Sequence, residues 1–350
     1  STTVSTTVFA DSWQQLSASG SPPGRTSHAL VGIPSEGTLY VFGGNTASGY
    51  ENAVWKFSKT SEGSGSWQQL SPSGSVPSPR QEFGTAWSLD DRRMYIFGGT
   101  AEPNNLLNDL YLFTDSPADS WQQLFPTGSP PSARTFPAAV WDADTSKMYI
   151  FGGSDNTVKN DLHCYSSGDN SWQELSPSGA VPSKRNSHAA VWDPSEKKMY
   201  VFGGGDGTIT MNDLHSYNSQ SNTWTQLSPS GTPPSARRSM AADWSPSQRR
   251  MYVIGGRTSW SHSSSNYRND VHFYDTQANL WQEVSPGGSL PSSRAFFRGF
   301  WVSGQSRMYI VGGMQSDRAR LSDVYELTIS SSLPTTTGTW TTTTTASSST

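Results

Sequence analysis

The chain has 350 residues, of which 15% are charged and 12% are aromatic, and its net charge is −4. It therefore offers no basic field for nucleic acid or an anionic membrane, and no apolar run reaches the roughly 18 residues of a membrane span. The lone cysteine, Cys164, excludes an intrachain disulfide framework and a cysteine-based zinc site.

The first predicted element is a strand over residues 12–16, SWQQL, which carries a W-x-x-L frame. That frame recurs in every later unit of a repeat about 50 residues long. The most regular part of the repeat is a tyrosine three residues before a glycine pair, as in MYIFGG at residues 94–99. The six glycine pairs are 55, 54, 51, 52 and 57 residues apart. Regular spacing of this length indicates an array of similar supersecondary units.

Each unit predicts four short strands. In the fourth unit these are residues 187–192, 198–204, 212–217 and 223–227. Segments of this length between turn residues, rich in β-branched and aromatic side chains, are typical of β-strands. A glycine pair at a strand end favours a positive φ and close backbone approach, and not a phosphate loop, which would open a helix.

The last unit ends near residue 327 without its fourth strand. The tryptophan of residues 12–16 lies 12 residues before its arginine, and the other five Trp-to-Arg spacings are all 13. We therefore expect the N-terminal strand to complete the last unit, so that residues 1–327 form one domain. Residues 328–350, almost devoid of apolar side chains, predict a disordered Ser/Thr-rich tail.

These units resemble kelch repeats over about residues 11–327. The resemblance rests on the arginine before a His-Ala start (RTSHA, RNSHA), the Y-[VI]-[FIV]-G-G strand end, the N-D-[LV]-[YH] pattern and the later tryptophan. It implies an all-β fold: a six-bladed kelch-type β-propeller of four-stranded antiparallel blades, with the last blade closed by the N-terminal strand. Stacking the blades around an axis buries their faces against one another.

An arginine stands 18 residues before each glycine pair, and together these arginines predict a ring at one mouth of the central channel. The ring comprises Arg25, Arg80, Arg134, Arg185, Arg237 and Arg294. Such a ring could attract anions, but its repetition in every unit favours a structural role. The expected partners are the repeated Asp109, Asp161, Asp213, Asp270 and Asp323, with Ala53 in place of the first aspartate. His163, His215 and His272 occupy a repeated aromatic position and predict packing in preference to metal ligation.

Specificity should reside where the units differ. The fifth unit has the longest loop between its second and third strands, residues 257–268, which is rich in the side chains found at interface hot spots. The starts of the first strands also vary. The candidate partner-binding residues are Arg257, Trp260, His262, Tyr267, Arg268, Gln81, Glu82, Phe136, Asn186, Arg238 and Phe296. The alternative is an ordinary solvated loop whose Trp260 folds back on the blade edges.

No catalytic, cofactor or metal motif is evident, so the sequence favours a non-enzymatic, monomeric scaffold that binds a protein or peptide through one loop face. Two alternatives stay open. One is small-molecule, glycan or metal-dependent oxidase- or lyase-type activity at the channel mouth. The other is a secreted or cell-surface adhesion module with a Thr-rich stalk. The single cysteine and the lack of an Asn-x-Ser/Thr sequon favour the cytoplasm, whereas the Ser/Thr-rich tail and the missing initial Met fit secretion.

Overall fold

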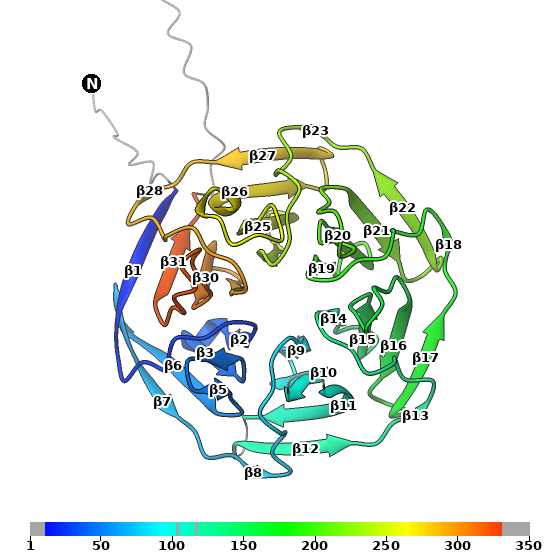
Figure 1. The fold of residues 1–350 in the computed structure, drawn as a ribbon, viewed down its shortest axis with the longest axis horizontal. Helices are drawn as coiled ribbons and strands as arrows, with labels where there is room; N and C mark the ends of the chain where they lie inside the picture. The colour runs from blue at the N-terminus through cyan, green and yellow to red at the C-terminus, as the bar shows by residue number, and fades with distance from the viewer. Residues whose placement is uncertain (1–10, 103–104, 116–117, 331–350) are drawn as a thin grey trace, which may run out of the picture.

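The structure is a computed structural model that describes residues 11–102, 105–115 and 118–330. The predicted tail beyond residue 330, and residues 1–10 of the predicted domain, lie outside the described residues. Sheets are arranged around a central axis to form an all-β propeller (Figure 1). The described residues include two short 3-10 turns, η1 (Pro34–Glu36) and η2 (Ser264–Asn266), and no helix long and apolar enough to cross a membrane.

The strands repeat in a fixed order from the channel outward. The innermost strands are β2 (Ala29–Ile33), β9 (Gly84–Ser88), β14 (Ala138–Asp142), β19 (Ala189–Asp193), β24 (Ala241–Ser245) and β29 (Arg298–Val302). The second strands are β3 (Thr38–Phe42), β10 (Arg93–Glu102), β15 (Lys147–Phe151), β20 (Lys198–Phe202), β25 (Arg250–Arg257) and β30 (Arg307–Val311). The third strands are β6 (Val54–Ser61), β11 (Asn105–Thr114), β16 (Leu162–Ser166), β21 (Leu214–Asn218), β26 (Tyr267–Asp275) and β31 (Val324–Thr328).

The outer strands are β7 (Ser64–Gln69), β12 (Ser120–Leu124), β17 (Ser171–Leu175), β22 (Thr223–Leu227), β27 (Leu280–Val284) and the N-terminal β1 (Ser12–Ser19). Antiparallel pairing joins successive strands of a unit. Each connection to the next unit adds a two-residue strand, which pairs in parallel with an outer strand: β8 (Ser73–Gly74), β13 (Thr127–Gly128), β18 (Ser178–Gly179), β23 (Ser230–Gly231) and β28 (Gly287–Gly288). The four middle sheets are therefore five-stranded, not four-stranded as expected.

The prediction of six separate blades is only partly met. Four units form separate sheets, but the first and last units share one nine-stranded sheet. Strand β1 causes the merger. Its residues Ser12 to Leu16 pair antiparallel with β31, as the sequence indicated. Its continuation, Ser17 to Ser19, pairs in parallel with β7. A further hairpin, β4 (Asn45–Thr46) with β5 (Gly49–Tyr50), lies in the first unit's loop.

The glycine pairs link neighbouring units. The second glycine of each pair donates its backbone N–H to the carbonyl of the following unit's repeated arginine, at 2.8–3.0 Å, and Gly313 closes the circle onto Arg25. At Gly99 the φ is +89°, and an added Cβ would lie 2.4 Å from the Gln81 carbonyl oxygen. Glycine is needed there because the backbones approach too closely for any side chain. The pairs therefore serve inter-unit packing.

Aromatic side chains fill the space between neighbouring sheets. In four units the tyrosine before a glycine pair stacks on the tryptophan of the next unit's innermost strand. Tyr95 and Trp141 have ring centroids 4.8 Å apart, and Tyr252 and Trp301 are separated by the same distance. This offset stacking adds to the area buried by the rings. The high tryptophan content therefore belongs largely to the core.

Candidate functional site

The six repeated arginines are buried between strands, each no more than 1% exposed. Arg134 shows the shared pattern: its Nη1 donates to the Gly152 carbonyl at 2.9 Å, and its two terminal nitrogens donate to both Asp161 oxygens at 2.7 Å. Arg80, Arg185, Arg237 and Arg294 pair in the same way with Asp109, Asp213, Asp270 and Asp323. Each of these guanidinium groups is therefore already hydrogen-bonded within its own unit.

Arg25 lacks the aspartate because Ala53 stands at that position. Its Nη1 still donates to the Gly43 carbonyl at 2.8 Å, but its Nη2 has no hydrogen-bond partner among the described residues. Burial lowers the pKa of Arg25 to about 10, and Glu51 opposes that shift. The repeated network is therefore incomplete in the first unit.

Three histidines extend this network. His163 and His215 contact the Oδ2 atoms of Asp161 and Asp213 at 3.1 and 2.9 Å through Nε2, and His272 contacts its aspartate at 3.2 Å. Their position is aromatic in other units, but their contacts are polar and orient the aspartates. The described residues contain no group of three or more His, Cys, Asp or Glu side chains arranged to hold a metal ion.

A belt of six residues encircles the channel where the innermost strands begin. Its members, Ser27, Glu82, Phe136, Ser187, Ser239 and Phe296, all have φ between +52° and +64°. Each N–H donates to the carbonyl of the belt residue in the preceding unit, at 2.6–3.4 Å, and Ser27 closes the circle on Phe296. Left-handed backbone costs each of these L-residues about 1–2 kcal/mol, which the shared ring of hydrogen bonds offsets.

At one side of the belt, two predicted binding residues lie against each other. The Cζ of Arg238 lies 3.3 Å from the ring centroid of Trp260, a close cation–π contact. Arg238 is 2% exposed; its Nη2 donates to the Ser187 hydroxyl at 3.0 Å, while Nε and Nη1 have no partner in the described part of the chain. Trp260 also approaches Gly205 of the preceding unit. It thus folds over the neighbouring sheet and covers the arginine.

A second arginine adjoins this pair. The Cζ of Arg257 lies 4.6 Å from the Phe296 ring centroid, and Phe296 lies 6.3 Å from the Phe136 ring. Arg257 is 5% exposed, and its Nε and Nη1 also lack partners among the described residues. We call Glu82, Phe136, Arg238, Arg257, Trp260 and Phe296 the entrance cluster. Belt closure brings these residues together from four different repeats.

The charges of the entrance cluster are poorly compensated. Burial and the neighbouring Arg257 together lower the pKa of Arg238 to about 9, although Glu82 opposes them. Burial also lowers the pKa of Arg257, with Tyr267 opposing. Burial raises the pKa of Glu82 to about 7, against the opposing effect of Arg238. Near neutral pH the cluster therefore holds two guanidinium groups and a carboxyl group that is only partly ionised.

The other predicted binding residues lie outside this cluster. Gln81 donates from Nε2 to the Tyr50 hydroxyl at 3.2 Å, and Asn186 is buried. Tyr267 is also buried, and its hydroxyl lies 2.8 Å from His262 Nδ1. Arg268 donates back to the Ser265 carbonyl at 2.7 Å. His262, Tyr267 and Arg268 are thus engaged within the long loop, whereas the Oδ1 of Asn186 has no hydrogen-bond partner among the described residues.

The sequence interpretation missed two charged residues in the channel wall. They are Asp243 in β24 and Arg298 in β29. At the position of Asp243, other innermost strands carry Val31, Val140 and Val191. At the position of Arg298, other innermost strands carry Ala138, Ala189 and Ala241. Both charged residues line a central cavity of about 450 Å³. Their departure from an apolar repeated position was the available signal.

Comparison with known protein families covers the whole repeat region in two overlapping segments. The model of the KLHDC2/KLHL20/DRC7 kelch-repeats domain matches residues 2–195 and 146–350. The chain therefore belongs to the kelch-repeat family, a class of β-propeller protein, and the resemblance read from the sequence is confirmed.

Its relatives carry these repeats within longer proteins. The leucine-zipper-like transcriptional regulator 1 homolog of Drosophila melanogaster is 28% identical over 88% of this chain and 31% of its own length. Kelch domain-containing protein 3 of Bos taurus is 28% identical over 61% of this chain and 56% of its own length. Acyl-CoA-binding domain-containing protein 5 of Arabidopsis thaliana is 26% identical over 70% of this chain and 38% of its own length. The chain thus spans about a third to a little over half of these relatives.

Proposed function

We propose that this chain is a non-enzymatic scaffold that binds an acidic segment of a protein or peptide at the entrance cluster. One observation carries the proposal: Arg238 and Arg257 are both buried, yet each has two N–H-bearing nitrogens without an acceptor in the described residues. Buried charged donors are costly unless paired. A carboxylate side chain from a ligand would accept from both guanidinium groups.

The aromatic residues of the cluster support a peptide ligand over a free inorganic anion. Trp260 and Phe296 present ring faces to the two arginines, and Phe136 extends the same surface. Aromatic and arginine side chains together dominate the binding energy of many interfaces. A segment with one acidic and one apolar side chain would use both features.

We further infer that the propeller has six blades, with residues 1–327 as one domain. Six belt residues and six glycine-to-arginine hydrogen bonds each close a full circle. The nine-stranded sheet then corresponds to two blades joined through β1, because each half contains four antiparallel strands. Thr328 ends β31 and Ile329 is buried, so the tail boundary predicted at residue 328 is two residues too early. We propose, from its composition, that the chain beyond residue 330 is a disordered tail.

The test is selection of peptides from a random 12-residue display library on the purified protein. Enriched peptides should contain Asp or Glu next to an apolar residue. Fluorescence anisotropy then measures an enriched peptide against Trp260→Ala and Arg257→Ala, each of which should weaken binding at least tenfold. Phe125→Ala is the matched control, since Phe125 is 75% exposed, follows outer strand β12 and should not affect binding.

Two results would contradict the proposal. One is a selected consensus without acidic residues. The other is a peptide whose affinity survives both substitutions while the melting temperatures of the variants stay within about 2 °C of the parent. Tyr267→Ala is unsuitable as a binding test, because that side chain is 3% exposed and its loss would disturb β26 itself.

A further inference from the structure

The central cavity has the dimensions of a small-molecule site. Its volume is about 450 Å³, within the range of roughly 300–1,000 Å³ typical of ligand pockets. Most of its wall is apolar and is built from short side chains such as Ala138, Ala139 and Ala190, with Trp87 and Trp141 among the larger ones. Such a wall suits the body of a small organic molecule more than a chain of water molecules.

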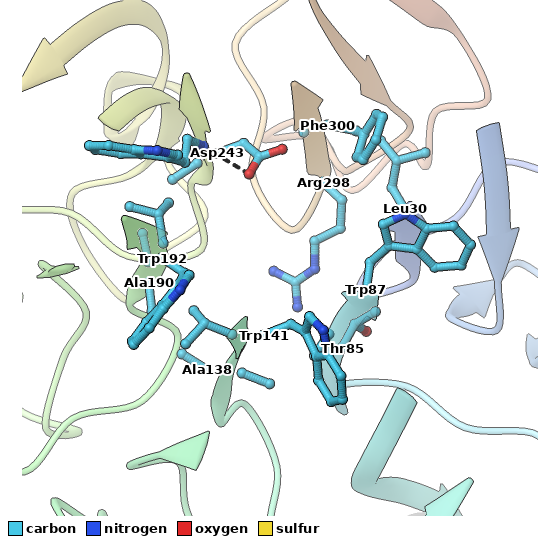
Figure 2. A pocket seen from close by; sticks show the side chains of 18 of the residues that line it. Leu30, Thr85, Trp87, Ala138, Trp141, Ala190, Trp192, Asp243, Arg298 and Phe300 are labelled. Carbon is cyan, nitrogen blue, oxygen red and sulfur yellow. Dashed lines mark hydrogen bonds between the residues drawn. The ribbon is translucent and has the colours of Figure 1, made fainter. Parts of the chain in front are cut away.

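The guanidinium group of Arg298 enters this space. Figure 2 shows the side chain extending from β29 towards the middle of the cavity, between Thr85 and Trp87 on one side and Ala190 on the other. It makes no hydrogen bond and no ion pair within residues 11–102, 105–115 and 118–330, and burial lowers its pKa. A guanidinium group in low-dielectric surroundings favours a counter-ion.

Asp243, the other charged group of the wall, does not serve as that counter-ion. Its carboxylate oxygens accept hydrogen bonds from the backbone N–H groups of Trp244, at 2.8 Å, and Trp301, at 2.6 Å. Those bonds hold the carboxylate against the wall between β24 and β29 (Figure 2). No ion pair joins Asp243 and Arg298 in the described structure. The cavity thus offers one unpaired cation beside one fixed carboxylate.

We propose that the central cavity binds a small organic monocarboxylate, with its carboxylate held by Arg298 and its apolar body lying along the alanine- and tryptophan-lined wall. A single guanidinium group matches one planar carboxylate in a bidentate arrangement. A phosphate dianion is a poorer match, because it would need further donors and would be repelled by Asp243. The cavity adjoins the entrance cluster, because Phe136 and Phe296 also line it. Arg298 does not belong to that cluster, however, and the inference does not rest on the proposed peptide binding.

The cavity also has a defined orientation. Belt residues Ser27, Phe136 and Phe296 line one end, where the ring of backbone hydrogen bonds encircles the channel. Asp90 and Pro194, in the turns between first and second strands, line the other end. The turn end therefore lies at the opposite end of the innermost strands from the entrance cluster.

The test is isothermal titration calorimetry of the whole chain with benzoate, phenylacetate and hexanoate, each compared with its neutral amide. We expect at least one carboxylate to bind with a Kd below about 1 mM, as befits a ligand of this size, and its amide to bind much more weakly. Arg298→Ala should weaken carboxylate binding roughly 10- to 100-fold, the range expected for a charge-assisted pair. Arg298→Lys should give an intermediate loss.

The repeat itself provides the controls. Arg298→Ala installs the residue that Ala138, Ala189 and Ala241 already have at this position, and Asp243→Val installs that of Val140 and Val191. Asp243→Val removes a negative charge and should not weaken carboxylate binding. Equal affinity for acid and amide, full binding by Arg298→Ala, or no binding by any of the three acids would each overturn the proposal. Peptide affinity at the entrance cluster should be unchanged in Arg298→Ala, so the two proposals fail independently.

Discussion

Trp13 anchors the strand that joins the two ends of the chain, so its removal tests whether the propeller depends on that strand for closure. The side chain is 2% exposed and meets Tyr325 of β31 edge to face, with ring centroids 6.3 Å apart. Replacing a buried tryptophan by alanine costs about 3–5 kcal/mol. With roughly 2.1 cal/mol/K of unfolding entropy per residue, Trp13→Ala should lower the Tm of this 350-residue chain by about 4–7 °C.

The matched control is Trp172→Ala. Trp172 occupies the same repeated position in β17, is 4% exposed, and lies in a sheet whose strands are consecutive in the chain. Both variants should melt earlier by a similar amount in differential scanning calorimetry. Only Trp13→Ala should release the N-terminal segment to limited proteolysis. Each of the other outer strands directly follows the third strand with which it pairs, whereas β1 pairs with β31 from the opposite end of the sequence.

Deletion of residues 1–17 should destabilise at least as strongly as Trp13→Ala. It also removes Leu16, which is 4% exposed, together with all of the pairing between β1 and β31. A synthetic peptide of residues 11–19 added to the truncated protein should restore part of the lost Tm. The closure argument is refuted if the truncated protein melts within 1 °C of the full chain, or if protease releases the N-terminus equally in both tryptophan variants.

Two further predictions concern the arginine network. Ala53→Asp should give Arg25 the carboxylate partner that its five counterparts have, and should raise the Tm by about 1–3 °C. The control Ala53→Asn should raise the Tm less. If the aspartate variant melts no higher than the asparagine variant, the prediction is contradicted. Burial raises the pKa of Asp161, but hydrogen bonds from Arg134 and His163 outweigh it and leave that pKa well below the ordinary value. A depressed pKa contributes stability above about pH 4 that is lost as the pH falls. The drop in Tm from pH 5 to pH 3 should therefore be smaller in Asp161→Asn than in the parent, and equal drops would argue against the linkage.

Much of the architecture could be predicted because it repeats. Strand β22 (Thr223–Leu227) begins and ends where the sequence places it, and the pairing of Arg134 with Asp161 follows from spacing alone. The completion of the last unit by residues 12–16 was also predictable, since the tryptophan frame recurs there without its preceding strands. Each of these features depends on contacts within one unit or between a unit and its neighbour.

The tertiary structure alone decided the rest. The parallel pairing of Ser17 to Ser19 with β7, which merges two units into one sheet, depends on where the ring closes. The entrance cluster unites residues as distant as Glu82 and Phe296, because only the closed belt determines which unlike residues face each other across the channel. The same closure encloses Arg298 in a cavity with no counter-ion in the described residues. The local sequence pattern thus determined how each unit folds. Closure of the ring determined which of the residues that differ between units come into contact.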